Sequence, residues 1–157
     1  MEDKLVKHFT DSIYYELEKT ARVLRLLGVQ MFEKIDAGLG GDEHAALDTI
    51  SCNPNICQRD LAKLILKDRA NTGKIINSLE EKKLIERCID TKNNRLVKKV
   101  KITEKGEETL AYINNQLEKM FNEQRTNCKI NLDDIEKVQC LLKRLRLSFE
   151  ELIDMKI

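Results

Sequence analysis

The sequence has little of what several protein classes require. It contains no Trp, three Tyr, four Phe and a single Pro. No stretch approaches the roughly 18 consecutive apolar residues of a membrane-spanning helix. The N-terminal residues MEDKLVKHFTDS also lack the charged and then apolar order of a signal peptide. We therefore expect a cytoplasmic protein without a membrane partner.

Cysteine and histidine occur in patterns that exclude more than they indicate. The five cysteines are odd in number and scattered in a chain without secretory features, so a disulfide framework is not expected. CNPNIC has no second ligand pair at zinc spacing. With two histidines, no G-x-S-x-G sequence and no phosphate-binding loop, no catalytic constellation stands out. Neither an enzyme, a metal site nor a cofactor is predicted.

Charge, by contrast, is distributed unevenly. The net charge is +1, yet residues 59–105 hold 14 Lys and Arg against 7 Asp and Glu, which leaves −6 on the remainder. This asymmetry indicates a polyanion-binding centre on an acidic scaffold. Leu, Ile, Lys and Glu dominate the composition, which favours helices.

The N-terminal part of the chain is expected to be helical. Apolar residues recur at helical spacing from Leu5 to about Ala37, which predicts one long amphipathic helix. The glycines in residues 38–41 end it, and Asp42 is expected to cap a short following helix.

Two short helices joined by a tight turn then form a helix-turn-helix pattern. The first lies in CQRDLAKLIL and is expected to bury Leu61, Ala62, Leu64 and Ile65. The second is capped by Asp68, and its inward stripe is Thr72, Ile75, Ile76 and Leu79. Its outward face suits base edges in DNA, where Arg and Asn bind bidentately and small residues allow close approach. That face consists of Arg69, Ala70, Asn71, Gly73, Lys74, Asn77 and Ser78. The alternative is an ordinary solvated helix surface.

The sequence next changes to a period of two, which predicts a β-hairpin. Residues for the two faces of a strand alternate in LIERCID and in VKKVKIT, which predicts two strands, and the polar residues TKNN join them. Such a hairpin can reach the minor groove or run along phosphates, and its expected contact residues are Lys92, Asn93, Asn94 and Arg95. Lys98, Lys99 and Lys101 alternate between faces, so they cannot all touch DNA.

Two more helices are expected after the hairpin. Thr103 caps the first, and Asn131 with Asp134 opens the last, which runs through Leu152. The apolar residues of this last helix point to more than one side. One small domain cannot cover that surface, so a partner subunit is the simplest cover.

The segment CQRDLAKLILKDRANTGKIINSLEEKKLIERCIDTKNNRLVKKVKITEKGEE resembles the winged helix-turn-helix core of MarR-type transcriptional regulators. Several features of the family match together in this segment. They are DLAKL, the Asp-Arg opening of the second helix, LEEKKLIER, the Asn-x-Arg loop and ITEKG. Long helices before and after this core also fit. In the family, Asp-x-Arg is followed after five residues by Leu-Thr. Here Asn93 replaces the Asp and six residues separate Arg95 from Ile102, so a bulge or a longer tip is expected.

The resemblance implies a mainly α fold with a small β-hairpin wing. It also implies a homodimer that places two recognition helices on a pseudo-palindromic double-stranded DNA operator. Residues 1–37 and 104–157 would form the helical dimerisation region, and residues 42–103 the DNA-binding core. Such regulators usually repress genes, and a small effector or thiol oxidation often releases them. For the oxidation alternative Cys57 is the candidate, because it falls at a helix N-cap. A winged-helix protein-interaction adaptor without DNA binding is a further alternative.

Overall fold

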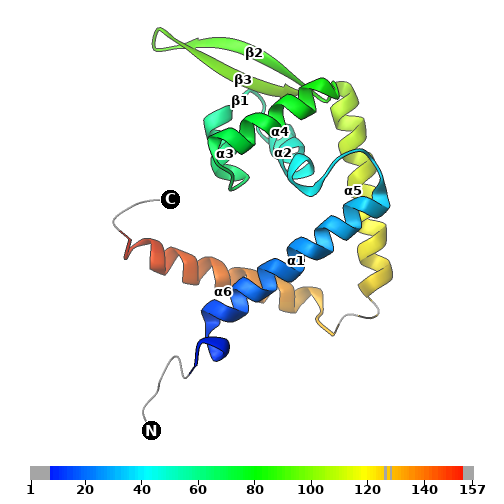
Figure 1. Ribbon diagram of the computed structural model, residues 1–157, viewed down its shortest axis with the longest axis vertical. Coiled ribbons are helices and arrows are strands. Elements are labelled where there is room, and N and C mark those ends of the chain that lie inside the picture. The colour runs from blue at the N-terminus through cyan, green and yellow to red at the C-terminus, as the bar shows by residue number, and fades with distance from the viewer. Residues whose placement is uncertain (1–7, 126, 128, 154–157) are drawn as a thin grey trace. The chain divides into compact units, whose positions relative to one another are not determined.

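The computed structural model describes residues 8–125, 127 and 129–153. Its fold is mainly helical with a small antiparallel sheet, as expected (Figure 1). The chain forms two compact units, Met1–Leu117 and Glu118–Ile157. Among the described helices, none is long and apolar enough to cross a membrane.

The elements of the first unit follow one another in the expected order with two additions. They are η1 (Phe9–Asp11), α1 (Ile13–Ile35), α2 (Gly41–Cys52), β1 (Ile56–Cys57), α3 (Gln58–Leu64), α4 (Arg69–Glu81), β2 (Ile85–Lys92), β3 (Arg95–Ile102) and the first part of α5 (Glu104–Arg125). The two additions, η1 and β1, are both too short to show a period in the sequence.

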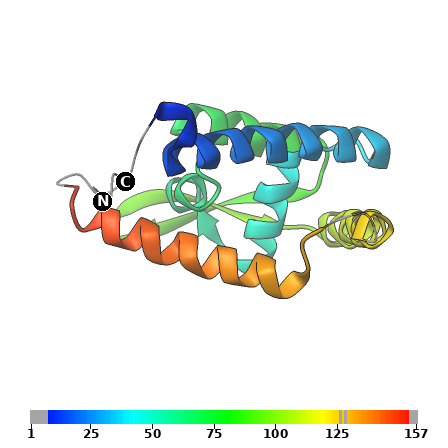
Figure 2. The same cartoon turned by 90° about the horizontal axis from the view of Figure 1, so that it is seen from below.

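Helix α1 begins later than predicted. Ser12 has extended backbone angles and its hydroxyl accepts the Tyr15 N–H at 3.1 Å, so the helix starts at Ile13 and not at Leu5. Leu5 itself lies outside the described residues. From Ile13 the helix runs without interruption until Asp36, whose φ of 50° ends it (Figure 2). The N-cap serine therefore sets the start of the helix, although the helical spacing of apolar residues begins earlier in the sequence.

The predicted cap of α2 is also wrong. Gly40, not Asp42, is the N-cap residue, and its N–H donates to the Glu43 carboxylate at 3.1 Å. Asp42 lies in the first turn, where its charge favours the helix N-terminus, and it forms an ion pair with Lys67 at 2.8 Å.

The core of the winged domain lies between α2, α3, α4 and the sheet. Its fully buried large side chains are Leu47, Ile50, Leu61, Ile76, Leu79, Ile85, Ile113 and Thr72. Three predicted core residues differ, since Leu64 is 57% exposed and Ile65 and Ile75 are only half-buried. Helix α3 is seven residues long and ends at Leu64, so its last turn leaves the core.

The sheet has three strands in the order β1-β3-β2, where two were expected. β1 adds only the pairs Ile56↔Val100 and Cys57↔Lys99 to β3. Val100 is buried at the centre of the sheet and fixes the base of the hairpin, which extends beyond the helices (Figure 1).

The hairpin turn is tighter than expected. β2 and β3 stay paired without a break from Ile85↔Ile102 to Lys92↔Arg95, which leaves only Asn93 and Asn94 unpaired. Their φ values of 53° and 58° are those of a type I′ turn, whose twist matches a hairpin and which Asn tolerates. The predicted bulge or longer tip is therefore wrong, because the additional residue is part of a regularly paired strand.

Helix α5 begins at a contact that glycine alone allows. The Thr103 hydroxyl oxygen caps it by accepting the Gly106 N–H at 3.0 Å, as predicted. A Cβ on Gly106 would lie 2.2 Å from the Leu84 carbonyl oxygen and 2.6 Å from Ile102 Cγ1. The Thr103 N–H donates to that same Leu84 carbonyl at 3.0 Å, and the Thr103 hydroxyl donates to Lys83 O at 2.8 Å. The end of α4, the end of the hairpin and the start of α5 are thus joined.

The second unit contains the end of α5 and α6 (Leu132–Glu150). Asn131 caps α6 as predicted, accepting the Asp134 N–H at 2.8 Å. The helix ends at Glu150, so Leu152 follows it and is not part of it. None of the α6 residues is buried.

Gly106→Ala is expected to lower the free energy of unfolding by about 3 kcal/mol, because the Leu84 carbonyl cannot retreat without losing its hydrogen bond to Thr103. Urea denaturation measures the change. Gly28→Ala is the matched control, since a Cβ there meets nothing within 4 Å and α1 gains up to about 1 kcal/mol of helix propensity. Equal destabilisation of both variants would show that the close approach at Gly106 is not the cause.

Candidate nucleic-acid interface

The first turn of α4 is fixed by its cap. The Asp68 carboxylate accepts the backbone N–H of Asn71 at 2.8 Å and its side-chain amide at 2.6 Å. These hydrogen bonds, the backbone one first, hold the pKa of Asp68 below its usual value. Behind the cap, the Thr72 hydroxyl donates to Asp68 O at 2.8 Å. Arg69, Ala70 and Asn71 are therefore presented on an ordered helix start.

Most of the predicted base-reading residues of α4 are exposed. They are Arg69, Ala70, Asn71, Lys74 and Asn77. Gly73 lies elsewhere, because it is half-buried and a Cβ on it would lie 3.3 Å from Gln58 Nε2 of α3. Its small size therefore serves the approach of α3 to α4.

Ser78 does not lie on the outward face either. It is half-buried, and its hydroxyl donates to the Glu43 carboxylate at 2.5 Å. Glu43 also accepts from Lys82 Nζ at 2.7 and 2.9 Å, so this carboxylate ties α2 to the C-terminal half of α4. Burial raises the pKa of Glu43, but the hydrogen bonds from Lys82, Ser78 and the Gly40 N–H outweigh it and lower the pKa.

Arg87 of the wing, which the sequence did not single out, contacts α4. Its Nη2 donates to Asn77 Oδ1, and its Nε lies 3.2 Å from Glu80 Oε2. The Asn77 amide is thereby oriented with its N–H₂ group left over as a donor. Arg87 stands opposite Val100, so the base of the wing and α4 are held at a fixed angle.

The strand lysines of the wing are not equivalent. Lys99 lies 2.5 Å from Asp90, and Lys101 lies 3.4 Å from Glu86. Hydrogen bonding to Asp90 raises the pKa of Lys99, and hydrogen bonding to Lys99 lowers the pKa of Asp90. Lys98 forms no ion pair within the described part of the chain. The register puts Lys98 on one face of the hairpin and the two paired lysines on the other.

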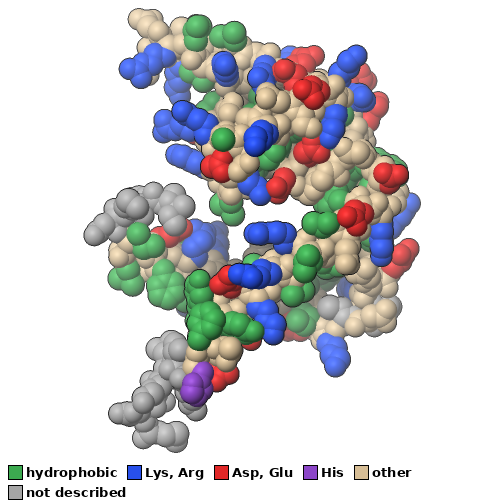
Figure 3. Space-filling model, in the orientation of Figure 1, with side chains coloured by type: hydrophobic (Ala, Val, Ile, Leu, Met, Phe, Trp, Pro, Cys, Tyr) green, Lys and Arg blue, Asp and Glu red, His purple; other side chains and the backbone are tan. Residues whose placement is uncertain are grey.

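A cleft of about 730 Å³ lies between the wing and the N-terminal ends of α3 and α4. Its charged lining residues are Arg59, Asp60, Arg69, Lys92, Arg95 and Lys98. As far as the chain is described, none of these five cations has an ion-pair partner. Lys and Arg side chains gather in Figure 3 on the wing and along the edge of the core beneath it. We call this surface the cationic cleft.

The cationic cleft brings together residues that the sequence placed in separate motifs. Arg69 of α4 and the tip residues Lys92 and Arg95 were predicted, and both turn residues, Asn93 and Asn94, lie beside them at the tip. Arg59 and Lys98 were not predicted as contact residues. For Lys98 the signal is its register with Ile89, because that pairing puts Lys98 on the face away from Asp90 and Glu86, the acids that pair with Lys99 and Lys101.

Cys57 occupies the N-cap of α3, as predicted, without a hydrogen bond from its side chain to the helix. Its thiol donates to the Asp60 carboxylate at 3.1 Å. On the sheet Cys57 and Cys88 both neighbour Lys99, from opposite sides of β3. Two strand spacings amount to about 9.5 Å, which exceeds the reach of a disulfide. Oxidation sensing stays a prediction.

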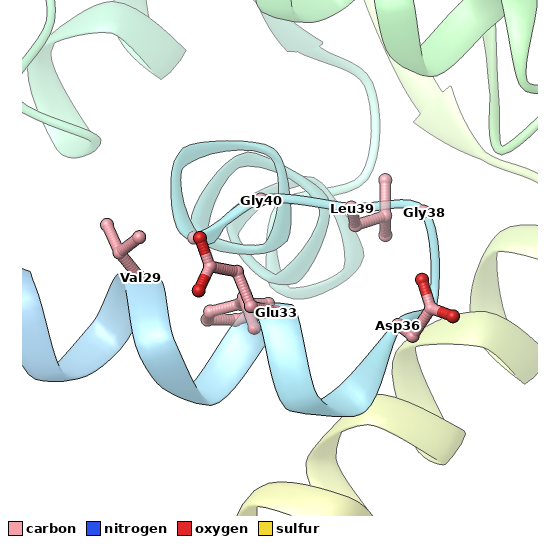
Figure 4. Close-up of a pocket in the computed structure, with 8 residues that line it drawn as sticks. Val29, Glu33, Asp36, Gly38, Leu39 and Gly40 are labelled. Carbon is pink, nitrogen blue, oxygen red and sulfur yellow. The ribbon is translucent and has the colours of Figure 1, made fainter.

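A second cavity, of about 310 Å³, lies where α1 turns into α2 (Figure 4). Val29, Phe32 and Leu39 supply apolar lining, and Glu33 and Asp36 add two carboxylates. Gly38, Gly40 and Gly41 also line it. The combination suits a ligand that is partly apolar and positively charged.

The comparisons with known proteins agree with this arrangement. The profile of the MarR family matches residues 42–97. The chain is 27% identical over 143 residues to the uncharacterised HTH-type transcriptional regulator YybA of Bacillus subtilis (strain 168), covering 89% of this chain and 90% of the relative.

Solved structures share the fold. The transcriptional regulator SlyA matches with a TM-score of 0.68 at 27% identity, over 88% of this chain and 94% of that chain. MepR of S. aureus in complex with DNA matches with a TM-score of 0.68 at 19% identity, over 90% of this chain and 99% of that chain.

Proposed function

We propose that this chain, a DNA-binding transcriptional regulator whose residues 42–97 match the MarR family, acts as a homodimeric repressor on a pseudo-palindromic operator. Each protomer would place α4 in the major groove, with half-sites about one helical turn apart. Catalysis forms no part of this proposal.

The cationic cleft carries the proposal. Five cations without ion-pair partners in the described chain converge there from α3, α4 and the wing, three segments that are separate in the sequence. Phosphate contacts of this kind orient a protein on a duplex but do not read its sequence. The exposed side chains of α4, Asn71 and Lys74 among them, stand next to the cleft and would read base edges.

Arg95→Ala is expected to weaken binding to duplex DNA about tenfold and to reduce the slope of log K against log salt by about 0.9 for each phosphate that is no longer neutralised. The reason is that Arg95 stands at the turn without an ion-pair partner in the described chain. Fluorescence anisotropy at several salt concentrations, with an operator selected from genomic duplexes, measures both quantities.

Lys101→Ala is the charge-matched control for Arg95→Ala. Lys101 lies at the base of the hairpin, far along the strand from the tip, and it is paired with Glu86, so its removal should leave the salt slope unchanged. If both variants show the same decrease in affinity and slope, the wing acts only through its net charge and the assignment of Arg95 is wrong.

The homodimer is proposed because both long terminal helices expose apolar side chains. On α1 these include Ile13, Tyr14, Val23, Leu24, Leu26 and Val29, and on α6 they include Ile135, Val138, Leu141, Leu147 and Phe149. Hydrophobic side chains gather at the N-terminal end of α1 in Figure 3. Each helix taken by itself is amphipathic, and an apolar stripe of this kind is normally buried against another element.

Leu141→Glu is expected to convert the dimer to a monomer at micromolar concentration, because a carboxylate would have to be buried without a partner. Sedimentation velocity measures the change. Leu96→Glu places the same charge on the wing, where Leu96 is 77% exposed, and should leave the dimer intact. A wild-type chain that sediments as a monomer would exclude the operator model.

We propose that an effector of the repressor binds the cavity between α1 and α2. Glu33 and Asp36 would favour a cation there, and the aromatic ring of Phe32, which also lines the cavity, would add to the attraction. The Gly38 carbonyl of this cavity also accepts from Lys82 Nζ at 2.7 Å, so a hydrogen bond joins the loop to the end of α4 and a ligand that shifts the loop would act on that helix.

Benzyltrimethylammonium is expected to raise the melting temperature and to lower operator affinity, whereas benzylsulfonate, of similar size and opposite charge, should do neither. Glu33→Gln should weaken the effect of the cation about tenfold. Differential scanning fluorimetry and anisotropy provide the two readouts. Equal responses to both compounds would show that the carboxylates of the cavity do not select the ligand.

A further inference from the structure

Two apolar side chains of the wing remain uncovered by its fold. Ile89 is 70% exposed and Leu96 is 77% exposed. Cross-strand partners of an antiparallel hairpin share a face, and successive residues alternate faces. The pairs Ile89↔Lys98 and Thr91↔Leu96 therefore put Ile89 and Leu96 on one face as diagonal neighbours.

This face continues from the buried base of the sheet to the cationic cleft. Ile85 and Val100 lie on the same face nearer the core, where both are buried. Toward the tip, Leu96 and Lys98 line the cleft together with Arg69 of α4. The exposed apolar pair thus borders the surface proposed to receive DNA.

The opposite face of the wing carries two internal ion pairs below the tip residues Lys92 and Arg95. Lys99 is paired with Asp90 and Lys101 with Glu86, whereas Lys98 has no ion-pair partner in the described chain. Lys98 and the two uncovered apolar side chains are therefore on the same face, and Lys92 and Arg95 reach the cationic cleft from the tip. A strand face that meets only solvent would require neither an unpaired cation nor two exposed apolar side chains.

We propose that Ile89 and Leu96 pack against the deoxyribose rings that wall the minor groove, while Lys92, Arg95 and Lys98 hold the flanking phosphates. This inference rests on the DNA-binding function proposed above. Minor-groove proteins combine cations with apolar side chains such as Leu and Ile in this way. The apolar packing adds affinity on any sequence and limits how deeply the wing enters the groove.

The competing explanation is that Ile89 and Leu96 only stabilise the hairpin through their diagonal packing. The two roles differ in what they change. A hairpin role lowers the melting temperature of the free protein when either residue is replaced. A DNA role lowers affinity without altering its salt dependence, because apolar packing releases no condensed counterions.

The test uses the full chain and the selected operator duplex, titrated at several salt concentrations. Leu96→Thr and Ile89→Thr keep β propensity but remove most of the apolar surface. Each is expected to weaken binding about tenfold at every salt concentration, with the salt slope and the melting temperature of the free protein unchanged. Leu64→Thr, at a 57% exposed leucine outside the cleft, is the control and should bind as the wild type does.

Three outcomes would overturn the inference. Wild-type affinity in Leu96→Thr and Ile89→Thr shows that neither side chain packs against DNA, and the DNA-binding function stands. A fall in melting temperature large enough to account for the weaker binding assigns both residues to the hairpin alone. A wild-type protein that binds no duplex at any salt concentration removes this inference together with the proposed function.

Discussion

The close approach of Gly106 to the Leu84 carbonyl holds three elements of the winged core in one place. Leu84 follows α4 and directly precedes β2, while Thr103 and Gly106 follow β3 and begin α5. Because Thr103 donates to both Lys83 O and Leu84 O, neither end of the hairpin can shift without breaking hydrogen bonds to the backbone. The angle between the wing and α4, and so the form of the cationic cleft, follows from this junction.

Charge inside the winged core is divided between structural and available cations. Lys82, Arg87, Lys99 and Lys101 are paired with carboxylates. The lysines and arginines of the cationic cleft, which have no such partner in the described chain, are gathered from three elements. A net charge of +1 for the chain conceals this division. The local arrangement, more than the total charge, makes the surface suitable for a polyanion.

Much of the winged core could be predicted from the sequence because its signals are local. The alternation in LIERCID and VKKVKIT predicted the hairpin, and Asp68 and Thr103 predicted two helix starts that the hydrogen bonds confirm. What could not be predicted depends on distant partners. Ser78 is drawn inward by Glu43, 35 positions away, and the space beside Gly73 is occupied by Gln58. The strand β1 is only two residues long, so no period exists to reveal it.

The two-residue Asn93–Asn94 turn also bears on how the wing folds. Its residues adopt left-handed geometry, and every pair of the hairpin follows from the turn by simple zipping toward the base. The loop that must close is very short, so the entropy of closure is small and hairpins of this kind form in about 1–10 μs. The wing therefore requires no long-range search to find its register. The slow step of folding is left to the contacts between residues distant in the chain, such as Ile113 with the core and Glu43 with Lys82.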